Sequence, residues 1–134
     1  MQQPVCADAL VVDDDPRSRE LMRIVLEVEG YRARLAGDGV EALEMLRARL
    51  PDVVLLDLRM PGMDGLEFCR RARAIAGAAV VPIVVLSGLA DQATRASVAA
   101  SGASAFLAKP LDRRALRECL AELRCKGAGN ASID

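Results

Sequence analysis

Residues 53–57 read Val-Val-Leu-Leu-Asp, an uninterrupted apolar run that ends on a carboxylate. The same pattern occurs at Leu10–Val12, which runs into three aspartates, and at Ala105–Ala108, which runs into Lys109 and Pro110. An apolar run without alternation is typical of a strand buried on both faces, as in a parallel sheet covered by helices. Parallel strands bring their carboxyl ends to one edge, where open α/β sheets bind ligands. The three runs therefore predict a charged functional site at one edge of a sheet.

Strand-like and helical patterns alternate along the chain, which is typical of an α/β fold. The predicted strands are Ala9–Val12, Tyr31–Ala36, Val53–Leu56, Ile83–Leu86 and Phe106–Ala108. Five such units with short loops predict a doubly wound, five-stranded parallel sheet with right-handed crossovers. Arginines alternate with apolar residues in the second strand, so we expect that strand at an edge of the sheet.

Capping residues and apolar spacing indicate where the helices begin. Asp15 and Pro16 open the first helix, in which apolar residues recur at helical spacing at Leu21, Ile24, Val25 and Val28. Asp38 and Glu41 stand three residues apart at the start of the second helix, which is the spacing of a capping box.

The composition fits a single globular domain. The chain has 134 residues, 52% of them hydrophobic, and a net charge of −1, so neither a nucleic-acid-binding arm nor a membrane-binding face is indicated. We expect one domain over residues 1–125. Over residues 126–134 the composition turns to glycine, alanine, asparagine and serine, which predicts a flexible tail or the stub of a linker.

The four cysteines include no Cys-x-x-Cys pair, and the chain has no histidine. A zinc site is therefore not indicated, and we interpret the cysteines as free thiols in a reducing cytoplasm. The N-terminus lacks a basic region followed by an apolar run, so a secretory signal is not expected. Without histidine, Ser-His and Cys-His mechanisms and histidine acid–base catalysis within this chain are excluded.

Three carboxylates meet at the predicted edge, because Asp13 and Asp14 follow the first strand and Asp57 ends the third. Carboxylates this close repel one another unless a cation intervenes, and Mg²⁺ prefers oxygen ligands of this kind. Lys109 adds a point charge for an anionic oxygen, and Ser87 adds a hydroxyl after the fourth strand. Alone, each of the aspartates and Ser87 would be interpreted as a helix cap or loop residue, whereas Lys109, one of only two lysines in the chain, is a marked choice at a strand end. Together they favour phosphoryl transfer, with a carboxylate as nucleophile.

With these residues in this order, the chain resembles the receiver domain of two-component response regulators, from Leu10 to about Leu123. The matching segments are Val11–Asp15, Leu56–Gly65, Val85–Gly88 and Ser101–Pro110. The resemblance implies a flavodoxin-like strand order, 2-1-3-4-5. It also implies a cis peptide bond between Lys109 and Pro110.

The resemblance implies a metal site and a phosphoacceptor. Asp57 would form an acyl phosphate and would also bind the metal, which is Mg²⁺ with Mn²⁺ as a possible substitute. Asp14 would bind the metal directly, Asp13 mainly through water, and the backbone carbonyl of Arg59 would be a further ligand.

The resemblance also implies a switch. Ser87 and Lys109 would hold the phosphoryl oxygens, and Phe106 would turn inward when Ser87 moves toward the phosphate. Such a domain is not a conventional enzyme, although it catalyses its own phosphorylation and dephosphorylation at Asp57. The surface over Asp91–Leu123 would report the phosphorylated state to a downstream effector domain or protein.

The implied partners are a histidine kinase or phosphotransfer protein, the effector, and a second copy in a phosphorylation-linked dimer. Nucleic acid and membrane are not expected as direct partners, and the expected location is the cytoplasm. Two alternatives remain open. One is a docking module that never gains phosphate. The other is a Mg²⁺-dependent aspartyl phosphatase. Such enzymes commonly carry a second acid two residues after the nucleophile, and Arg59 at that position argues against this alternative.

Overall fold

The computed structural model describes residues 7–58, 63–75, 77–88 and 91–133, with the side chains of 125–133 excepted. Strands and helices alternate through these residues as the sequence predicts. The strands are β1 (Ala7–Val12), β2 (Tyr31–Ala36), β3 (Val53–Asp57), β4 (Ile83–Ser87) and β5 (Ala105–Ala108). The helices are α1 (Pro16–Val28), α2 (Gly39–Ala48), α3 (Gly65–Arg73), α4 (Gln92–Ala100) and α5 (Arg113–Ile133), with a short 3-10 helix, η1 (Ala78–Val80), before β4.

The strands form one parallel sheet in the order β2-β1-β3-β4-β5. This confirms the predicted fold class and strand order, and it puts β2 at an edge. The register aligns the carboxyl ends of the central strands, pairing Asp57 with Leu86 and Ser87 with Ala108. β3 and β4 extend one residue past the predicted apolar runs, so Asp57 and Ser87 are themselves strand residues.

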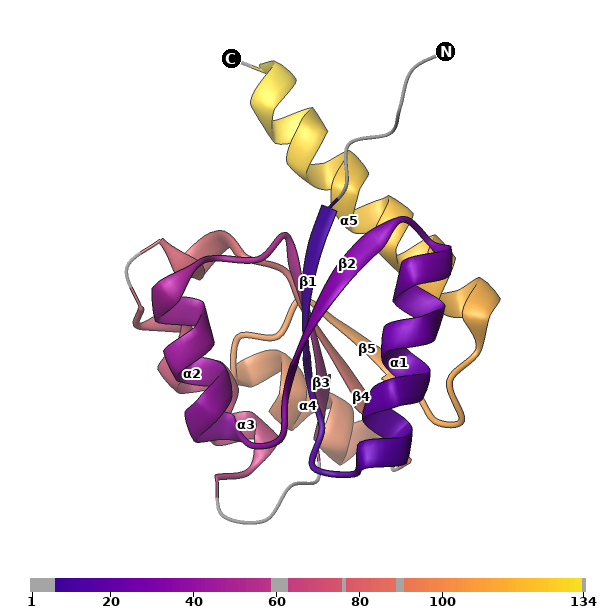
Figure 1. Ribbon diagram of the computed structural model, residues 1–134. Coiled ribbons are helices and arrows are strands. Elements are labelled where there is room, and N and C mark those ends of the chain that lie inside the picture. The colour runs from indigo at the N-terminus through magenta and orange to yellow at the C-terminus, as the bar shows by residue number, and fades with distance from the viewer. Residues whose placement is uncertain (1–6, 59–62, 76, 89–90, 134) are drawn as a thin grey trace.

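Helices cover both faces of the sheet (Figure 1). α1 and α5 pack on one face, against a core that includes Val53 and Leu55. α2, α3 and α4 pack on the other face, against a core that includes Val54 and Leu56. Successive residues of β3 therefore enter opposite cores, which explains why its sequence is apolar without alternation.

Aspartate caps fix the points where the helices begin. The Asp15 carboxylate accepts the backbone N–H of Arg17 at 3.1 Å, and Asp38 accepts that of Glu41 at 2.8 Å. The Glu41 carboxylate in turn accepts the N–H of Gly37 at 2.9 Å, so the predicted box is made with the residue before the cap. Because the cap of α1 follows β1 by three residues, the chain turns sharply at the edge that carries the acidic residues.

The buried stripe of α1 differs from the one that the apolar spacing selected. Of the predicted positions only Val25 is buried, together with Met22 and Leu26. The other three keep about half their surface exposed: Leu21 54%, Ile24 46% and Val28 60%. We call these three residues the α1 apolar stripe. Both stripes repeat at helical spacing, so periodicity alone does not distinguish the face that packs on the sheet.

α5 continues past the point where the composition predicted a flexible tail. The helix runs to Ile133 and so includes the backbone of residues 126–133. Glycine, asparagine and serine lower helix propensity but do not block the backbone hydrogen bonds as a proline would, and the alanines favour the helix. The helix is therefore longer than the composition suggested, while the boundary at residue 125 and the flexible tail or linker stub after it stay predictions.

Two cysteines among the described residues are free thiols, Cys69 buried in α3 and Cys119 half-buried in α5. Burial raises the pKa of both thiols above the usual cysteine value, which makes the reactive thiolate scarce at neutral pH. In the described part of the chain, none of the helices has the length and apolar character needed to span a membrane.

Candidate functional site

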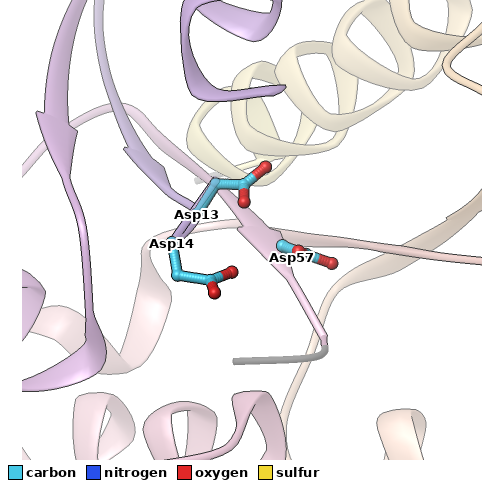
Figure 2. Close-up of side chains that lie close together, drawn as sticks. All are labelled: Asp13, Asp14 and Asp57. Atoms are coloured by element: carbon cyan, nitrogen blue, oxygen red, sulfur yellow. The ribbon is translucent and has the colours of Figure 1, made fainter. Parts of the chain in front are cut away.

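The predicted acidic cluster forms at the carboxyl edge of the sheet (Figure 2). Asp13 and Asp14 follow the last residue of β1, and Asp57 is the last residue of β3. One carboxylate oxygen from each lies within 4.8 Å of one from each of the others. Asp13 is fully buried and Asp57 is 6% exposed, whereas Asp14 is open to solvent. The site is therefore an acidic cluster of two buried carboxylates and one that reaches solvent.

Asp13 is held from two directions. Its Oδ1 accepts the backbone N–H of Asp15 at 2.9 Å, and its backbone carbonyl accepts a hydrogen bond from the Arg19 guanidinium at 2.9 Å. Its Oδ2 is buried and has no hydrogen-bond partner among the described residues. A buried carboxylate oxygen without a partner is costly, so this atom is suited to a cation or to a water that a cation holds.

Lys109 connects β5 to the cluster. Its Nζ donates to Asp57 Oδ1 at 3.0 Å, and its backbone N–H donates to the Ser87 carbonyl at 2.8 Å. The Lys109–Pro110 peptide bond is cis, as the resemblance implied. Three carboxylates and one ammonium carry a formal net charge of −2, which a divalent cation would balance.

The donor set fits Mg²⁺, which takes oxygen ligands and usually keeps several waters of its own. Asp14 and Asp57 each offer a carboxylate oxygen, and Asp13 adds the buried Oδ2 that has no hydrogen-bond partner among the described residues. The expected fourth contributor, the carbonyl of Arg59, lies outside the described residues.

Ser87 and Phe106 lie on the same side of the sheet. Ser87 ends β4 and is 1% exposed. Phe106 pairs in register with Val85, two residues before Ser87, and side chains two apart in a strand face the same way. The Phe106 ring is half-buried against the core beneath α2, α3 and α4. Both predicted switch residues therefore face the helix layer that contains α4.

Two arginines that no sequence pattern had indicated also contribute to this region. Arg19 fixes the backbone of Asp13, and the Arg95 guanidinium lies over the Phe106 ring at 4.6 Å from its centroid. Arg95 is the only charged residue of α4, and that isolation was the available signal. Arg19 is one of many arginines, and nothing in the sequence distinguishes it.

A groove of about 300 Å³ lies beside the acidic cluster, between α1 and the turn after β5. Leu21, Lys109 and Pro110 are among the residues that line it. Leu21 also begins the α1 apolar stripe, so the groove joins that stripe to the side chain that binds Asp57.

The response regulator receiver domain family matches residues 9–121 of the chain. Response regulator MprA of Mycobacterium ulcerans is 44% identical over 115 residues, which are 86% of this chain and 47% of that protein. The DNA-binding response regulator MtrA of Mycolicibacterium smegmatis is 44% identical over 107 residues, 80% of this chain and 46% of that protein. The chain thus spans about half the length of these curated relatives.

Solved structures give the same family. Chemotaxis protein CheY4 of Vibrio cholerae superposes with a TM-score of 0.84 at 30% identity, covering 89% of this chain and 99% of that one. The receiver domain of the sensor histidine kinase PA1611 from Pseudomonas aeruginosa, solved with a magnesium ion in its active-site cleft, superposes with a TM-score of 0.82 at 31% identity. It covers 89% of this chain and 98% of that one.

The family match runs from β1 into α5, so it includes the whole of the sheet apart from the first residues of β1. The strands that carry Asp13, Asp14, Asp57, Ser87 and Lys109 all lie within it. The chain therefore belongs to the family of response regulator receiver domains.

Proposed function

We propose that this chain accepts a phosphoryl group on Asp57 from a histidine kinase or phosphotransfer protein, in a Mg²⁺-dependent reaction in the cytoplasm. The observation that carries the proposal is the environment of Asp57. This carboxylate is almost buried, is bonded to Lys109 at 3.0 Å, and shares an acidic cluster with Asp13 and Asp14. Phosphoryl transfer needs in-line positioning and charge neutralisation rather than acid–base catalysis, so a site without histidine is sufficient.

In the proposed step an Asp57 oxygen attacks the phosphorus of a phosphohistidine. The phosphorus–nitrogen bond breaks, its electron pair stays on the imidazole nitrogen, which takes up a proton, and an aspartyl phosphate forms. Asp13, Asp14 and Asp57 would hold Mg²⁺, or Mn²⁺ in its place, and the ion would neutralise charge on the phosphoryl oxygens. Lys109 exchanges its bond to Asp57 for one to a phosphoryl oxygen, and the Ser87 hydroxyl donates to another.

Phosphorylation would then bias a two-state equilibrium of the surface formed by α4, β5 and α5, over residues 91–123. Ser87 and Phe106 are the proposed links, because both face the layer that contains α4. A downstream effector domain or protein, or a second copy of this chain, would recognise the shifted state. We do not expect this domain to contact nucleic acid directly.

The direct test is incubation with acetyl phosphate, with Mg²⁺ or with an excess of chelator, followed by intact-mass measurement. We expect a gain of one phosphoryl group per chain with Mg²⁺ and none with chelator. No gain with Mg²⁺ would leave the docking-module alternative, in which partner binding is insensitive to phosphate. Sustained turnover of a phosphate monoester would instead favour the aspartyl phosphatase.

The acidic cluster predicts that the effect of Asp13→Asn on the free energy of unfolding depends on whether Mg²⁺ is present. Without metal, removing one of three carboxylates relieves repulsion, and we expect the free energy of unfolding to rise by about 1 kcal/mol. With Mg²⁺, we expect the variant to gain less stability than the wild type, because it has lost part of the anionic donor set. Thermal unfolding followed by circular dichroism at increasing MgCl₂ measures both effects.

The matched control for this experiment is Glu118→Gln, which makes the same carboxylate-to-amide change on the exposed side of α5. Its Mg²⁺ response should equal that of the wild type. Equal Mg²⁺ responses in all three proteins would contradict the assignment of Asp13 to the metal site.

The phosphodonor has to contact the residues that border Asp57, because that carboxylate is only 6% exposed. The groove beside it leads from Lys109 to Leu21 and the α1 apolar stripe. An apolar stripe this exposed is stabilised when a partner covers it. We therefore propose that the phosphohistidine-bearing protein docks on the α1 apolar stripe.

Leu21→Asp is expected to slow phosphotransfer from the donor protein by about tenfold, because it places a charge in the apolar contact. Labelling by acetyl phosphate, which needs no docking surface, should be unchanged. Val80→Asp is the control, since Val80 is 86% exposed in η1, which precedes β4 at the opposite edge of the sheet. The docking assignment is wrong if both variants slow transfer equally, or if Leu21→Asp slows both reactions.

A further inference from the structure

The single charge of α4 lies over an aromatic ring. α4 contains one charged residue, Arg95, and its guanidinium carbon is 4.6 Å from the centroid of the Phe106 ring. This is within the range of a cation–π interaction, in which the positive group is attracted to the negative face of the ring. The contact joins a helix to the neighbouring edge strand, because Phe106 belongs to β5, which ends the sheet.

The ring that Arg95 covers lies near the site but outside it. Phe106 pairs in register with Val85, and Ser87 follows on the same face of β4. Lys109, which binds Asp57, is three residues after Phe106 along the chain. The ring packs against the core beneath α2, α3 and α4 while Arg95 itself is exposed. Movement of the ring relative to α4 would therefore stretch or break the contact.

We infer that Arg95 is a positioning residue that holds the Phe106 ring against α4 and so opposes the switched state. The inference rests on the proposed function, because it assigns an energetic role within the same phosphorylation switch. A contact made in one state and lost in the other shifts the equilibrium toward the state that has it. For an exposed cation–π pair the expected shift is about two- to fivefold.

Linkage makes the effect measurable at Asp57 as well as at the ring. Whatever disfavours the switched state also disfavours the phosphorylation that promotes it, by the same factor at equilibrium. Removing the cation should therefore raise the population of the switched ring position before phosphorylation. The binding of beryllium fluoride with Mg²⁺, which mimics a phosphoryl group, should tighten by the same two- to fivefold.

The chain offers a clean probe, since it has two phenylalanines and no tryptophan. Incorporation of 4-fluorophenylalanine gives one ¹⁹F resonance for Phe106 and one for Phe68, which is fully buried and serves as the internal reference for folding. The wild type is measured with and without beryllium fluoride and Mg²⁺, which defines the two ends of the Phe106 shift.

Arg95→Leu removes the cation and keeps bulk on an exposed helix position. We expect its Phe106 resonance to lie nearer the beryllium-fluoride end than that of the wild type, with Phe68 unchanged. Arg95→Lys should restore part of the wild-type position, because the cation is kept. Arg114→Leu, the same change at an exposed arginine of α5, should leave the resonance in place.

The outcomes separate this inference from the proposed function. If the wild-type Phe106 resonance responds to beryllium fluoride and Arg95→Leu does not differ from the wild type, the role of Arg95 is overturned and the phosphoacceptor stands. If Arg95→Leu and Arg114→Leu shift the resonance equally, the effect is one of net charge and the inference is overturned. If the wild type neither gains phosphate nor responds to beryllium fluoride, the proposed function fails, and the inference fails with it.

Discussion

Replacing Asp57 with asparagine is expected to abolish phosphorylation of this chain by acetyl phosphate and by a protein donor alike. The amide keeps the size and shape of the carboxylate at the end of β3, so the buried strand is preserved. It removes the negative charge and the nucleophilic oxygen of the carboxylate that Lys109 binds at 3.0 Å. Intact-mass measurement after incubation with acetyl phosphate and Mg²⁺ should show no gain.

The same strand supplies the control. Asp52 directly precedes β3, at the opposite end from Asp57, so Asp52→Asn makes an identical chemical change away from the acidic cluster. That variant should gain one phosphoryl group at the wild-type rate. A residual gain in Asp57→Asn as large as that of the control would mean that another residue accepts the phosphate.

Replacing Arg73 with methionine is expected to lower the free energy of unfolding by about 3 kcal/mol. The Arg73 guanidinium, at the end of α3, donates to backbone carbonyls rather than to a carboxylate in the described part of the chain. The acceptors are the carbonyls of Gly102, Ala78 and Val81, with the Ser104 hydroxyl as a further partner at 3.2 Å. One side chain thereby ties α3 to η1, to the residues between η1 and β4, and to the turn between α4 and β5.

The size of this effect follows from what the substitution leaves behind. Methionine fills the space of the aliphatic stem but leaves the carbonyls without their charged donor. The Arg73 side chain is partly withdrawn from water, and this burial lowers the pKa of its guanidinium from the usual value. Lysine has a single point of charge in place of a planar fork, so Arg73→Lys should recover less than half of the loss.

Arg71→Met is the matched control, because Arg71 lies on the same helix and pairs with Glu67 on the surface. Exposed ion pairs contribute little, so its free energy of unfolding should fall by less than about 0.5 kcal/mol. Urea denaturation followed by circular dichroism compares the variants. Equal losses for Arg73→Met and Arg71→Met would show that the carbonyl contacts do not stabilise the fold.

The sheet could be predicted from sequence because parallel strands buried on both faces have a distinctive pattern. Val53–Leu56 is apolar without alternation, and its residues do enter opposite cores. The edge position of β2 could also be predicted, because Arg32 and Arg34 alternate with apolar residues in that strand. The stripe of α1 could not be predicted, because Leu21 and Met22 are both apolar and only packing determines which one is buried.

The acidic cluster could be predicted because it depends on topology alone. Once β1 and β3 are parallel neighbours, Asp13 and Asp57 must meet at the same edge. The roles of Arg73 and Arg95 depend instead on side-chain reach across the sequence, to Gly102 and to Phe106. In a chain with so many arginines, nothing local marks Arg73 as a donor to carbonyls, and the isolation of Arg95 on α4 does not reveal which ring it contacts.

The central claim is that Asp57, of the three carboxylates gathered within 4.8 Å, is the one that reacts. The most direct test is to phosphorylate the chain with acetyl phosphate and Mg²⁺, trap the acyl phosphate by borohydride reduction, and locate the modified residue by peptide mass spectrometry. Reduction converts an aspartyl phosphate to homoserine, so the modified position can be read from the sequence of the peptide. The account predicts homoserine at position 57 and unmodified aspartate at 13 and 14. Homoserine at either of those two positions, or at none of the three, would contradict it.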